Sequence, residues 1–509
     1  MPILGSIIKS AIDIRSRIPA RKDVYKQQVR QLQWLLNKAE DTAIGRQYNF
    51  ADLALREDPV KAFQKTVPMY DYQSIFDTWW HRALKGEKDV CWPGKVKYFA
   101  LSSGTSDSSS KHIPVTKEMI KAIQKGTMKQ ILSTRHFKFK NEQYETEILF
   151  VGGSTNLNFN GTYFSGDLSG ITTGTQPRWF QNFSLPGREI TSLKDWESKL
   201  QEIVDKAKQW NVGFICGVPA WIQILFQRIV EHYKVQTIHD VWPNLAVFVH
   251  GGVAIHPYRQ SIDALCRKPL IYVDTYMASE GFLAFQERPN EHQAMKLLTD
   301  NKMFFEFIPF TSDNFDPDGL LLPQAKALNI AEVELEKDYA VLISNCSGAW
   351  RYLIGDTVRF TDLQRCEIII TGRVKHFLSL CGEHLSVDNM NKAIKMVAAD
   401  LNITINEYCV AGVPHEGLFA HEWYIGTDKE VDQKLLAEKL DEQLKALNDD
   451  YAVERKHALK EIRVNVLPNQ AFIDFLASRN KLGGQSKFPR VVKGKHLNNW
   501  LAFLETYKN

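Results

Sequence analysis

The spacing of hydrophobic positions divides the chain into a helical start and a longer stretch of mixed pattern. In the first hundred residues, apolar side chains recur three and four positions apart, which is the period of a helix with one buried face. The clearest run comprises Val24, Val29, Leu32, Leu35, Leu36 and Ala39. Gly45 then supplies a stop signal. The pattern predicts a mostly helical segment up to about residue 97.

From about Lys97 onward, short strand-like runs alternate with amphipathic stretches. The predicted strands are Glu147 to Val151, Gly213 to Cys216, Leu245 to Val249, Ile271 to Val273 and Ala340 to Ser344. Helical segments follow several of them, such as Ala220 to Tyr233. This alternation favours an α/β domain with a largely parallel sheet.

A second, smaller unit is predicted after the strand Glu367 to Thr371, which ends at Gly372 and Arg373. Helix, strand and charged helix follow at 389–399, 408–412 and 431–448. We therefore expect an α/β protein with a large N-terminal α/β domain of parallel or mixed sheets over residues 1–372. A smaller C-terminal α+β domain is expected over residues 373–509.

Composition excludes several classes of protein. The chain is 44% hydrophobic and has 12 Trp, which excludes a disordered chain. Lys and Arg number 63 and Asp and Glu 59, so the formal charge of +4 predicts no nucleic-acid partner. No stretch reaches the roughly 18 apolar residues of a membrane span. The apolar stripe from Ile3 to Ile12 favours packing onto the protein body over docking on a membrane surface.

The seven cysteines are dispersed, and none forms a Cys-x-x-Cys pair. Their odd number and wide spacing argue against a disulfide framework or a zinc ribbon. Reduced thiols in the cytoplasm are the expected state.

The segment from Ser102 to Lys111 is the most informative stretch of the chain. A β-like run feeds a loop of small hydroxyl residues around Gly104, and the loop ends in a lysine. Backbone N–H groups, short hydroxyls and one ammonium suit a polyphosphate. The loop lacks the Gly-x-x-x-x-Gly-Lys-Ser/Thr pattern of a Walker A motif. Taken alone, it reads almost equally well as a serine-rich linker.

Two further patches place polar groups beside predicted strands. The octet from Asp274 to Gly281 offers an aromatic ring, a hydroxyl and a carboxylate where ligands bind in open α/β sheets. Taken alone, it reads better as a core tyrosine followed by an exposed acid. In the segment from Trp350 to Arg359, a turn glycine precedes Asp356, whose carboxylate suits ribose hydroxyls. An ordinary turn between strands is the other interpretation.

Together these patches resemble the adenylate-forming (ANL) superfamily, and within it the auxin-responsive Gretchen Hagen family of acyl acid–amido synthetases, in a bacterial-type member. The marks occur in the family's order along nearly the whole chain, and each is weak alone. They are Ser102-Ser-Gly-Thr-Ser106 with Lys111-x-Ile-Pro114, Tyr276-x-Ala-Ser-Glu280-Gly, Tyr352-x-x-Gly-Asp356, Gly217-Val-Pro-Ala-Trp221, Gly251-Gly252, Phe305-Glu-Phe-Ile-Pro309 and Lys487-Phe-Pro-Arg490.

The resemblance implies a role for each motif residue. ATP phosphates would lie among Ser102, Ser103, Gly104, Thr105, Ser106 and Lys111. Tyr276, with Gly252 and Ser279 among the nucleotide-binding residues, would lie near adenine. Glu280 would bind Mg²⁺, whereas Tyr352 and Asp356 would hold the ribose. Gly372 and Arg373 would form the hinge of a mobile C-terminal domain that brings Lys487 into the site. The implied catalytic residues are thus Lys111, Glu280 and Lys487.

The resemblance also implies a reaction. A carboxylic acid would attack ATP to give an acyl adenylate and pyrophosphate, and an amine, expected to be an amino acid, would then displace AMP to give an amide. Thioester formation with coenzyme A and nucleotide binding without turnover are the alternatives. The acid, the amine and the oligomeric state are not specified.

Two features leave questions open. Asp107 and Ser108 stand where many relatives carry another glycine in the phosphate loop, and an acid beside phosphate is electrostatically unfavourable. The attacking amine must be neutral, so a base is required. His112, His250 and His256 lie near the candidate loops, but none is assigned that role.

Overall fold

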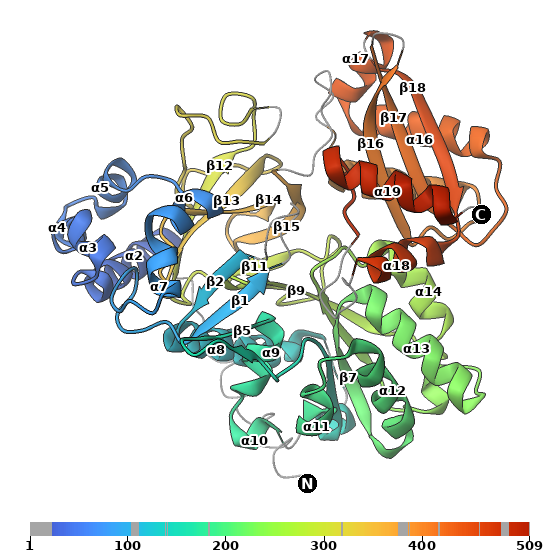
Figure 1. The fold of residues 1–509 in the computed structure, drawn as a ribbon, viewed down its shortest axis with the longest axis horizontal. Coiled ribbons are helices and arrows are strands. Elements are labelled where there is room, and N and C mark those ends of the chain that lie inside the picture. Colours follow the sequence, from blue (N-terminus) through green and yellow to red (C-terminus); the bar gives the residue numbers. More distant parts are fainter. Residues whose placement is uncertain are drawn as a thin grey trace.

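The structure is a computed structural model, and its fold is drawn in Figure 1. It describes residues 23–102, 111–137, 139, 141–181, 184–316, 319–374, 385, 387–415, 418–457, 459–479 and 488–507. The apolar stripe near the N-terminus and most of the serine-rich loop lie outside these residues.

Short helices form a layer at the N-terminal side, as the spacing of apolar residues predicts. They are α2 (Val24–Ala39), α3 (Ala43–Gln47), α4 (Phe50–Leu55), α5 (Pro59–Thr66), α6 (Tyr72–Ile75) and α7 (His81–Leu84). Leu32, Leu35 and Leu36 are fully buried on the inner face of α2. The Gln28 amide is also buried there and donates to the carbonyl oxygens of Thr299 and Met303. These contacts fix the helical layer on the edge of the large sheet (Figure 1).

A small sheet carries the two ends of the candidate phosphate loop. Its strands run in the order β2-β1-β5-β4. They are β1 (Tyr98–Ser102), β2 (Lys111–Val115), β4 (Asn158–Phe159) and β5 (Phe164–Gly166). β1 and β2 are antiparallel, and their register sets Ser102 opposite Lys111. The loop between them therefore begins and ends at one place.

The large sheet of the described residues has eleven strands in the order β12-β13-β14-β15-β11-β10-β9-β8-β7-β3-β6. One half is parallel. Its strands are β3 (Glu147–Val151), β6 (Ser184–Leu185), β7 (Val212–Gly217), β8 (Val247–Gly251) and β9 (Ile271–Ala278).

The other half of the large sheet is antiparallel. Its strands are β10 (Gly281–Phe285), β11 (Met295–Leu297), β12 (Met303–Pro309), β13 (Asp338–Asn345), β14 (Tyr352–Asp362) and β15 (Glu367–Arg373). The sheet changes from parallel to antiparallel at β9, so β9 lies where the two halves meet.

Helices cover the parallel half, and most follow a strand. They are α8 (Lys117–Ser133), α9 (Leu168–Gly174), α10 (Arg178–Gln181), α11 (Arg188–Thr191), α12 (Trp196–Lys206), α13 (Pro219–Tyr233) and α14 (His256–Ala264). Apolar side chains of α12, α13 and α14 share one buried core with β7 and β8. α8 packs instead on β10 and belongs to the other large core.

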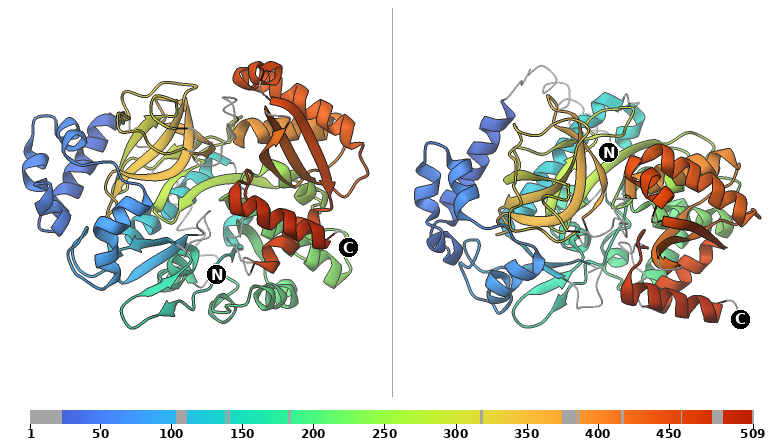
Figure 2. Two further views of the ribbon diagram at one scale, coloured as in Figure 1. Left: turned by 45° about the horizontal axis from the view of Figure 1, so that its top comes forward. Right: turned by 90° about the horizontal axis from the view of Figure 1, so that it is seen from above.

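The C-terminal part forms a separate α+β unit beside α14, as both views of Figure 2 show. Its strands are β16 (Glu407–His415), β17 (Leu418–Gly426) and β18 (Leu459–Leu467). Its helices are α15 (Val387–Asp400), α16 (Gln433–Leu447), α17 (Asp449–His457), α18 (Asn469–Ser478) and α19 (Gly494–Tyr507). Two apolar clusters lie on this unit, each made only of its own residues. The predicted fold class, a large α/β part and a smaller α+β part, is confirmed.

Three details differ from the sequence-based expectation. The large sheet is parallel in one half only, and the predicted strand Ala340 to Ser344 lies in the antiparallel half as part of β13. β9 does not end at Val273 but continues to Ala278, because β10 pairs with its second half. Gly355 does not lie in a turn between strands: it lies within β14, with a φ of 95°. In the part of the chain that the structure describes, no helix has the length and apolar character to cross a membrane.

Candidate active site

The turn between β9 and β10 presents Glu280, the predicted magnesium ligand. Gly281 pairs with Ala278 across the antiparallel hairpin, so Ser279 and Glu280 form its tip. Only 8% of Glu280 is exposed. The side-chain amide of Asn345 donates a 2.9 Å hydrogen bond to the Glu280 carbonyl and thereby fixes the turn.

Burial sets the charge state of Glu280. The pKa of its carboxyl is raised to about 7, chiefly by the loss of hydration. The charge of Asp356 also raises this pKa, whereas the cations Lys111 and Arg373 lower it. A carboxyl with this pKa is about half protonated at neutral pH and becomes charged when a cation approaches. The turn therefore holds a carboxylate suited to a cationic ligand.

Asp356 connects β9, β14 and β15. The Tyr276 hydroxyl donates a 2.7 Å hydrogen bond to Asp356 Oδ2. Arg373 stands opposite Asp356 in the β14–β15 register, and its Nε lies 2.8 Å from Oδ1. Each carboxylate oxygen has two acceptor positions, so both oxygens still have room for a hydroxyl donor. The group suits the two hydroxyls of a ribose.

Tyr352, at the start of β14, faces Glu280. Its side chain is almost fully buried, and its ring centroid lies 5.2 Å from that of Trp80. Burial raises the pKa of the Tyr352 phenol above its usual range, and Glu280 raises it further, both by its charge and as a hydrogen-bond acceptor. The phenol therefore stays protonated at neutral pH and directs a donor at Glu280.

Lys111 begins β2, beside the same cluster. Its ammonium lies 5.2 Å from the centroid of the Tyr72 ring. The Tyr72 hydroxyl accepts a hydrogen bond from the backbone N–H of His112, the next residue. Lys111 also lowers the pKa of Glu280 through its charge, so the two groups act on each other. The end of the phosphate loop and the carboxylate turn thus share one electrostatic environment.

The structure brings together most of the predicted site residues that it describes. Lys111, Tyr276, Glu280, Tyr352, Asp356 and Arg373 interact directly or through their charges. Ser102 lies opposite Lys111, Ser279 precedes Glu280, and Gly252 follows β8 with a φ of 85°. Ser103, Gly104, Thr105, Ser106 and Lys487 lie outside the described residues.

One pair of titratable groups near the site was not assigned from sequence. His250 and Asp274 are register partners on β8 and β9, with Nδ1 of the imidazole 3.5 Å from Oδ1 of the carboxyl. His250 is buried and neither ring nitrogen has a hydrogen-bond partner in the structure. Burial lowers the pKa of His250 to about 3 and raises that of Asp274 to about 7. Only the register of the two strands reveals the pair.

A buried ion pair was also missed. Arg351 and Glu306 form it at the junction of β12 and β14, directly before Tyr352. Both residues stand within quoted motifs, but their separation of 45 positions in the sequence gives no local signal for their contact.

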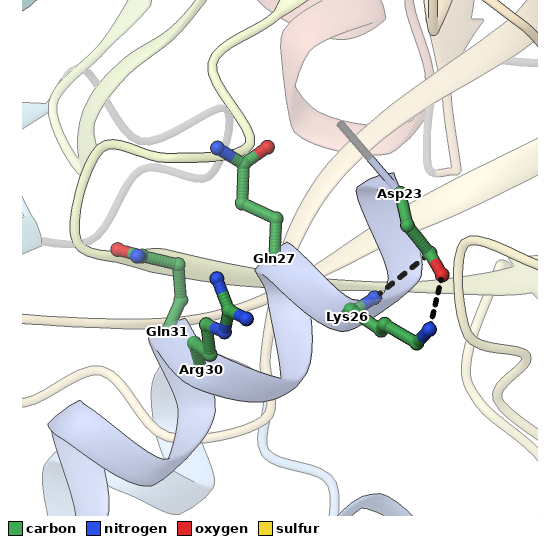
Figure 3. Close-up of a pocket in the computed structure, with 5 residues that line it drawn as sticks. All are labelled: Asp23, Lys26, Gln27, Arg30 and Gln31. Carbon is green, nitrogen blue, oxygen red and sulfur yellow. Dashed lines mark hydrogen bonds and ion pairs between the residues drawn. The ribbon is translucent and has the colours of Figure 1, made fainter. Parts of the chain in front are cut away.

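The surface hollow drawn in Figure 3 is separate from these motifs. It is lined by polar residues of the first turns of α2 and by the residue that caps the helix: Asp23, Lys26, Gln27, Arg30 and Gln31. Asp23 caps α2 through a 3.1 Å hydrogen bond from the Lys26 backbone. None of the predicted nucleotide-binding residues lines the hollow, so it is not the candidate site.

Comparison with solved structures shows the same fold in two kinds of ligase. The GH3.15 acyl acid amido synthetase in complex with 2,4-DB matches with a TM-score of 0.78 at 16% identity, over 99% of this chain and 96% of that one. A 2-hydroxyisobutyryl-CoA ligase in its postadenylation state matches with a TM-score of 0.58 at 12% identity, over 95% of this chain and 92% of that one.

Curated relatives match over shorter stretches. The indole-3-acetic acid-amido synthetase GH3.4 of Arabidopsis thaliana is 23% identical over 319 residues, or 58% of this chain and 50% of that protein. The jasmonoyl--L-amino acid synthetase GH3.5 of Oryza sativa subsp. japonica is 30% identical over 131 residues, or 24% of this chain and 22% of that protein. The matches therefore span half or less of these two relatives.

Family models account for most of the chain. The model of the GH3 family N-terminal domain matches residues 19–158 and 153–270, that of the central domain matches residues 296–373, and that of the C-terminal domain matches residues 388–496. These stretches contain the phosphate-loop, Tyr352–Asp356 and Lys487 motifs, whereas the carboxylate turn at residues 276–281 lies between two of them. This chain belongs to the GH3 family.

Proposed function

We propose that this protein is an ATP-dependent acyl acid–amido synthetase. It would activate a carboxylic acid as an acyl adenylate, release pyrophosphate, and pass the acyl group to an amino acid with loss of AMP. The observation that carries the proposal is the meeting of Lys111, Glu280, Asp356 and Arg373 at one polar cluster. They come from three separate strands and the β9–β10 turn, and the two carboxylates are buried whereas the Arg373 side chain is 48% exposed.

The donor set of the cluster fits ATP with Mg²⁺. No group of three His, Cys, Asp or Glu side chains that could cage a metal occurs among the described residues. Mg²⁺ with a nucleotide needs no such cage, because it uses one or two carboxylates, water and the phosphates. Glu280 would hold the ion, which when bound neutralises phosphate charge. Asp356 and Tyr352 would hold the ribose, and Tyr276 would lie near adenine.

Adenylation requires two anions to approach, so this chain must offset their charges. The acid carboxylate forms a bond to the α-phosphorus of ATP, and the bond from that phosphorus to pyrophosphate breaks. Lys111 would offset charge at the phosphates from the end of the loop that starts at Ser102. Lys487 would enter from the C-terminal part for this step.

Amide formation requires a neutral amine. The amine nitrogen bonds to the acyl carbon, the bond to AMP breaks, and the nitrogen gives up one proton to a base or to water. An amide product is supported by the names of two relatives, an indole-3-acetic acid-amido synthetase and a jasmonoyl--L-amino acid synthetase. A thioester product is the alternative within the same fold, since a coenzyme A ligase shares it.

We place the reaction in the cytoplasm. The described cysteines Cys91, Cys216, Cys266, Cys346, Cys366 and Cys409 all carry free thiols. Free thiols are the usual state in a reducing compartment.

The test is a two-stage assay on the purified full chain. Carboxylic acids, with indole and jasmonate types first, are screened for pyrophosphate release from Mg²⁺·ATP. For each acid that gives pyrophosphate release, amino acids or coenzyme A are added to the reaction, and the products are identified by mass spectrometry. An amide with release of AMP is expected. A thioester would replace the proposal by the alternative, and the absence of pyrophosphate release with every acid would refute enzymatic activation.

A further inference from the structure

Arg351 adopts a backbone conformation that residues with a side chain rarely take. Its φ is 41°, in the left-handed region, and it lies between β13 and β14. A non-glycine residue persists in this region only where its surroundings hold it there, and such residues cluster at functional sites. Arg351 directly precedes Tyr352, the residue that faces Glu280.

The Arg351 side chain is held on every side. Two of its nitrogens bond Glu306, with Nε 3.1 Å from Oε2 and Nη2 3.0 Å from Oε1. Its remaining nitrogen, Nη1, donates to the carbonyl oxygens of Gln64 and Val67 at 2.8 and 2.7 Å. The Gln64 amide also donates to Glu306 Oε1 at 3.0 Å. The guanidinium therefore ties the start of β14 to β12 and to the C-terminal end of α5.

The Arg351 backbone is held as well. Its N–H donates to Ser344 Oγ at 2.9 Å, and its carbonyl accepts from the Tyr70 N–H at 2.8 Å. The Tyr70 carbonyl in turn accepts from the Leu353 N–H at 2.7 Å. These bonds clamp the chain on both sides of Tyr352, so the direction of its side chain follows from the conformation of Arg351.

The ion pair is more elaborate than packing requires. Arg351 and Glu306 are 5% and 0% exposed, and an apolar pair of similar volume is often at least as stabilising as a buried ion pair. Apolar contacts, unlike hydrogen bonds, do not depend on direction. The guanidinium makes five charge-assisted hydrogen bonds, and together these select one backbone conformation. That selectivity matters here because the next residue carries the hydroxyl that faces Glu280.

We propose that Arg351 is a positioning residue for adenylation: its ion pair with Glu306 holds the left-handed residue that aims the Tyr352 hydroxyl at Glu280. The inference rests on the proposed function, in which Glu280 holds the cation of the nucleotide. It goes beyond that function by assigning a role to a residue that touches neither substrate nor metal.

A double-variant cycle tests this coupling. Arg351→Lys keeps the charge but loses the planar set of bonds, and Tyr352→Phe removes the hydroxyl. Each variant should lower the rate of ATP–pyrophosphate exchange about tenfold, as expected when a charge-assisted bond is lost. Combined, they should be no slower than Tyr352→Phe alone, because both act on one contact. If Arg351→Lys does not fold, Glu306→Gln takes its place, because it keeps the side-chain volume and part of the hydrogen bonding. It should lower the exchange rate by a similar factor.

The melting temperature supplies a second measurement. A role in stability alone would lower the melting temperature of Arg351→Lys and leave its exchange rate, measured below that temperature, equal to the wild-type rate. The positioning role instead predicts the same loss of exchange in Arg351→Lys and in Tyr352→Phe, whatever their melting temperatures.

Arg359→Lys is the matched control. Arg359 makes a two-bond ion pair with Asp338 between β14 and β13, and it is seven residues further along the chain than Tyr352. It should lower stability without changing exchange. Three results would overturn the proposal. The losses of exchange could multiply in the double variant, Arg351→Lys could be fully active, or Arg359→Lys could slow exchange as much as Arg351→Lys does.

The dissociation constant of Mg²⁺·ATP, measured by calorimetry in the same variants, separates two failures. If no acid supports pyrophosphate exchange by the wild type, the proposed activity fails. Non-additive changes in the dissociation constant of Mg²⁺·ATP would still report the coupling between Arg351 and Tyr352. If exchange is normal and both readouts are additive, only the role of Arg351 fails.

Discussion

The Tyr276 hydroxyl donates a 2.7 Å hydrogen bond to Asp356 Oδ2, across 80 positions of sequence. Arg373 approaches the other carboxylate oxygen at 2.8 Å, so Asp356 is held from both sides before any ligand arrives. Such a carboxylate has little orientational freedom left to lose when a ribose binds. Because Asp356 is already ordered in the folded protein, nucleotide binding does not have to supply the free energy of ordering it, and the affinity for the nucleotide is higher.

Removal of the Tyr276 hydroxyl tests this arrangement. Tyr276→Phe should raise the dissociation constant of Mg²⁺·ATP by about tenfold, since a hydrogen bond to a charged group is worth roughly 1.5 kcal/mol. The exchange rate at saturating ATP should change less, because Asp356 acts in binding. Tyr233→Phe is the control, because its hydroxyl bonds the carbonyl oxygens of Val204 and Asp205. An equal effect of both variants on ATP affinity would contradict the prediction.

The carboxyl of Glu280 should give the reaction an acid limb near neutral pH. Its pKa is raised to about 7, chiefly by burial, and only the charged form binds Mg²⁺ strongly. Exchange measured against pH at limiting Mg²⁺ should therefore rise as pH increases through about 7. Excess Mg²⁺ should move the limb to lower pH by mass action. If the midpoint pH of this acid limb did not change with the Mg²⁺ concentration, the assignment of Glu280 as the Mg²⁺ ligand would be contradicted.

The same carboxyl should make the ligand-free protein less stable as pH rises. Because the pKa of Glu280 in the folded state lies above the usual value of 4.5, the folded state binds the proton more tightly than the unfolded state does. The stability that this group contributes is full below pH 4.5 and is lost as pH rises through about 7. Glu280→Gln should thus raise the free energy of unfolding at pH 8 by up to about 3 kcal/mol relative to its effect at pH 4. Denaturant titrations at the two pH values measure this difference, and no difference would mean that the carboxyl is well hydrated.

Much of the fold follows from local pattern, whereas the finer geometry of the site depends on distant contacts. The strand Glu147 to Val151 appears within the bounds that its apolar run predicts. By contrast, Asp274 and Tyr276 look like loop residues in sequence, because polar side chains interrupt the run. They become part of β9 only because β10, which is entirely buried, pairs with this segment.

The limits of prediction are clearest at Arg351. Arginine gives no local signal for a left-handed backbone, and the bonds that hold it come from Glu306 and from Gln64, 287 positions away. His250 is similar, since its nearness to Asp274 depends on strand register alone. The roles of Ser103 to Ser106 and of Lys487, and the boundary at residue 373, stay predictions.

The hydroxyl of Tyr258 should restrain the C-terminal part of the chain against rotation relative to the N-terminal part. Tyr258 on α14 donates a hydrogen bond to Glu407 at the start of β16, and Arg490 donates to the same carboxylate at 2.6 Å. Tyr258 is buried, so Tyr258→Phe removes a bond that any rotation of the C-terminal part must break. Distance distributions between fluorophores on α13 and α16 should broaden in this variant.

The control for the junction is Tyr272→Phe. Its hydroxyl donates to Asp263 at 2.6 Å, and both residues belong to the N-terminal part. It removes the same kind of bond without crossing the junction, so the distance distribution should match that of the wild type. Identical distributions in all three proteins would show that Tyr258 does not restrain the C-terminal part.

Lys487 is expected to act on the chemical step of adenylation and not on the affinity for ATP. The segment that follows it is fixed to β16, because the Val410 N–H donates to the Arg490 carbonyl and the Val492 N–H donates to the Val410 carbonyl, both at 2.9 Å. Lys487→Ala should slow exchange at saturating ATP by two orders of magnitude or more, roughly the value of an electrostatic contact made in the transition state. Calorimetry should give an unchanged dissociation constant for Mg²⁺·ATP, with Lys456→Ala on α17 as the control for both measurements. Weakened ATP binding with a normal exchange rate would instead place Lys487 among the ground-state binding residues.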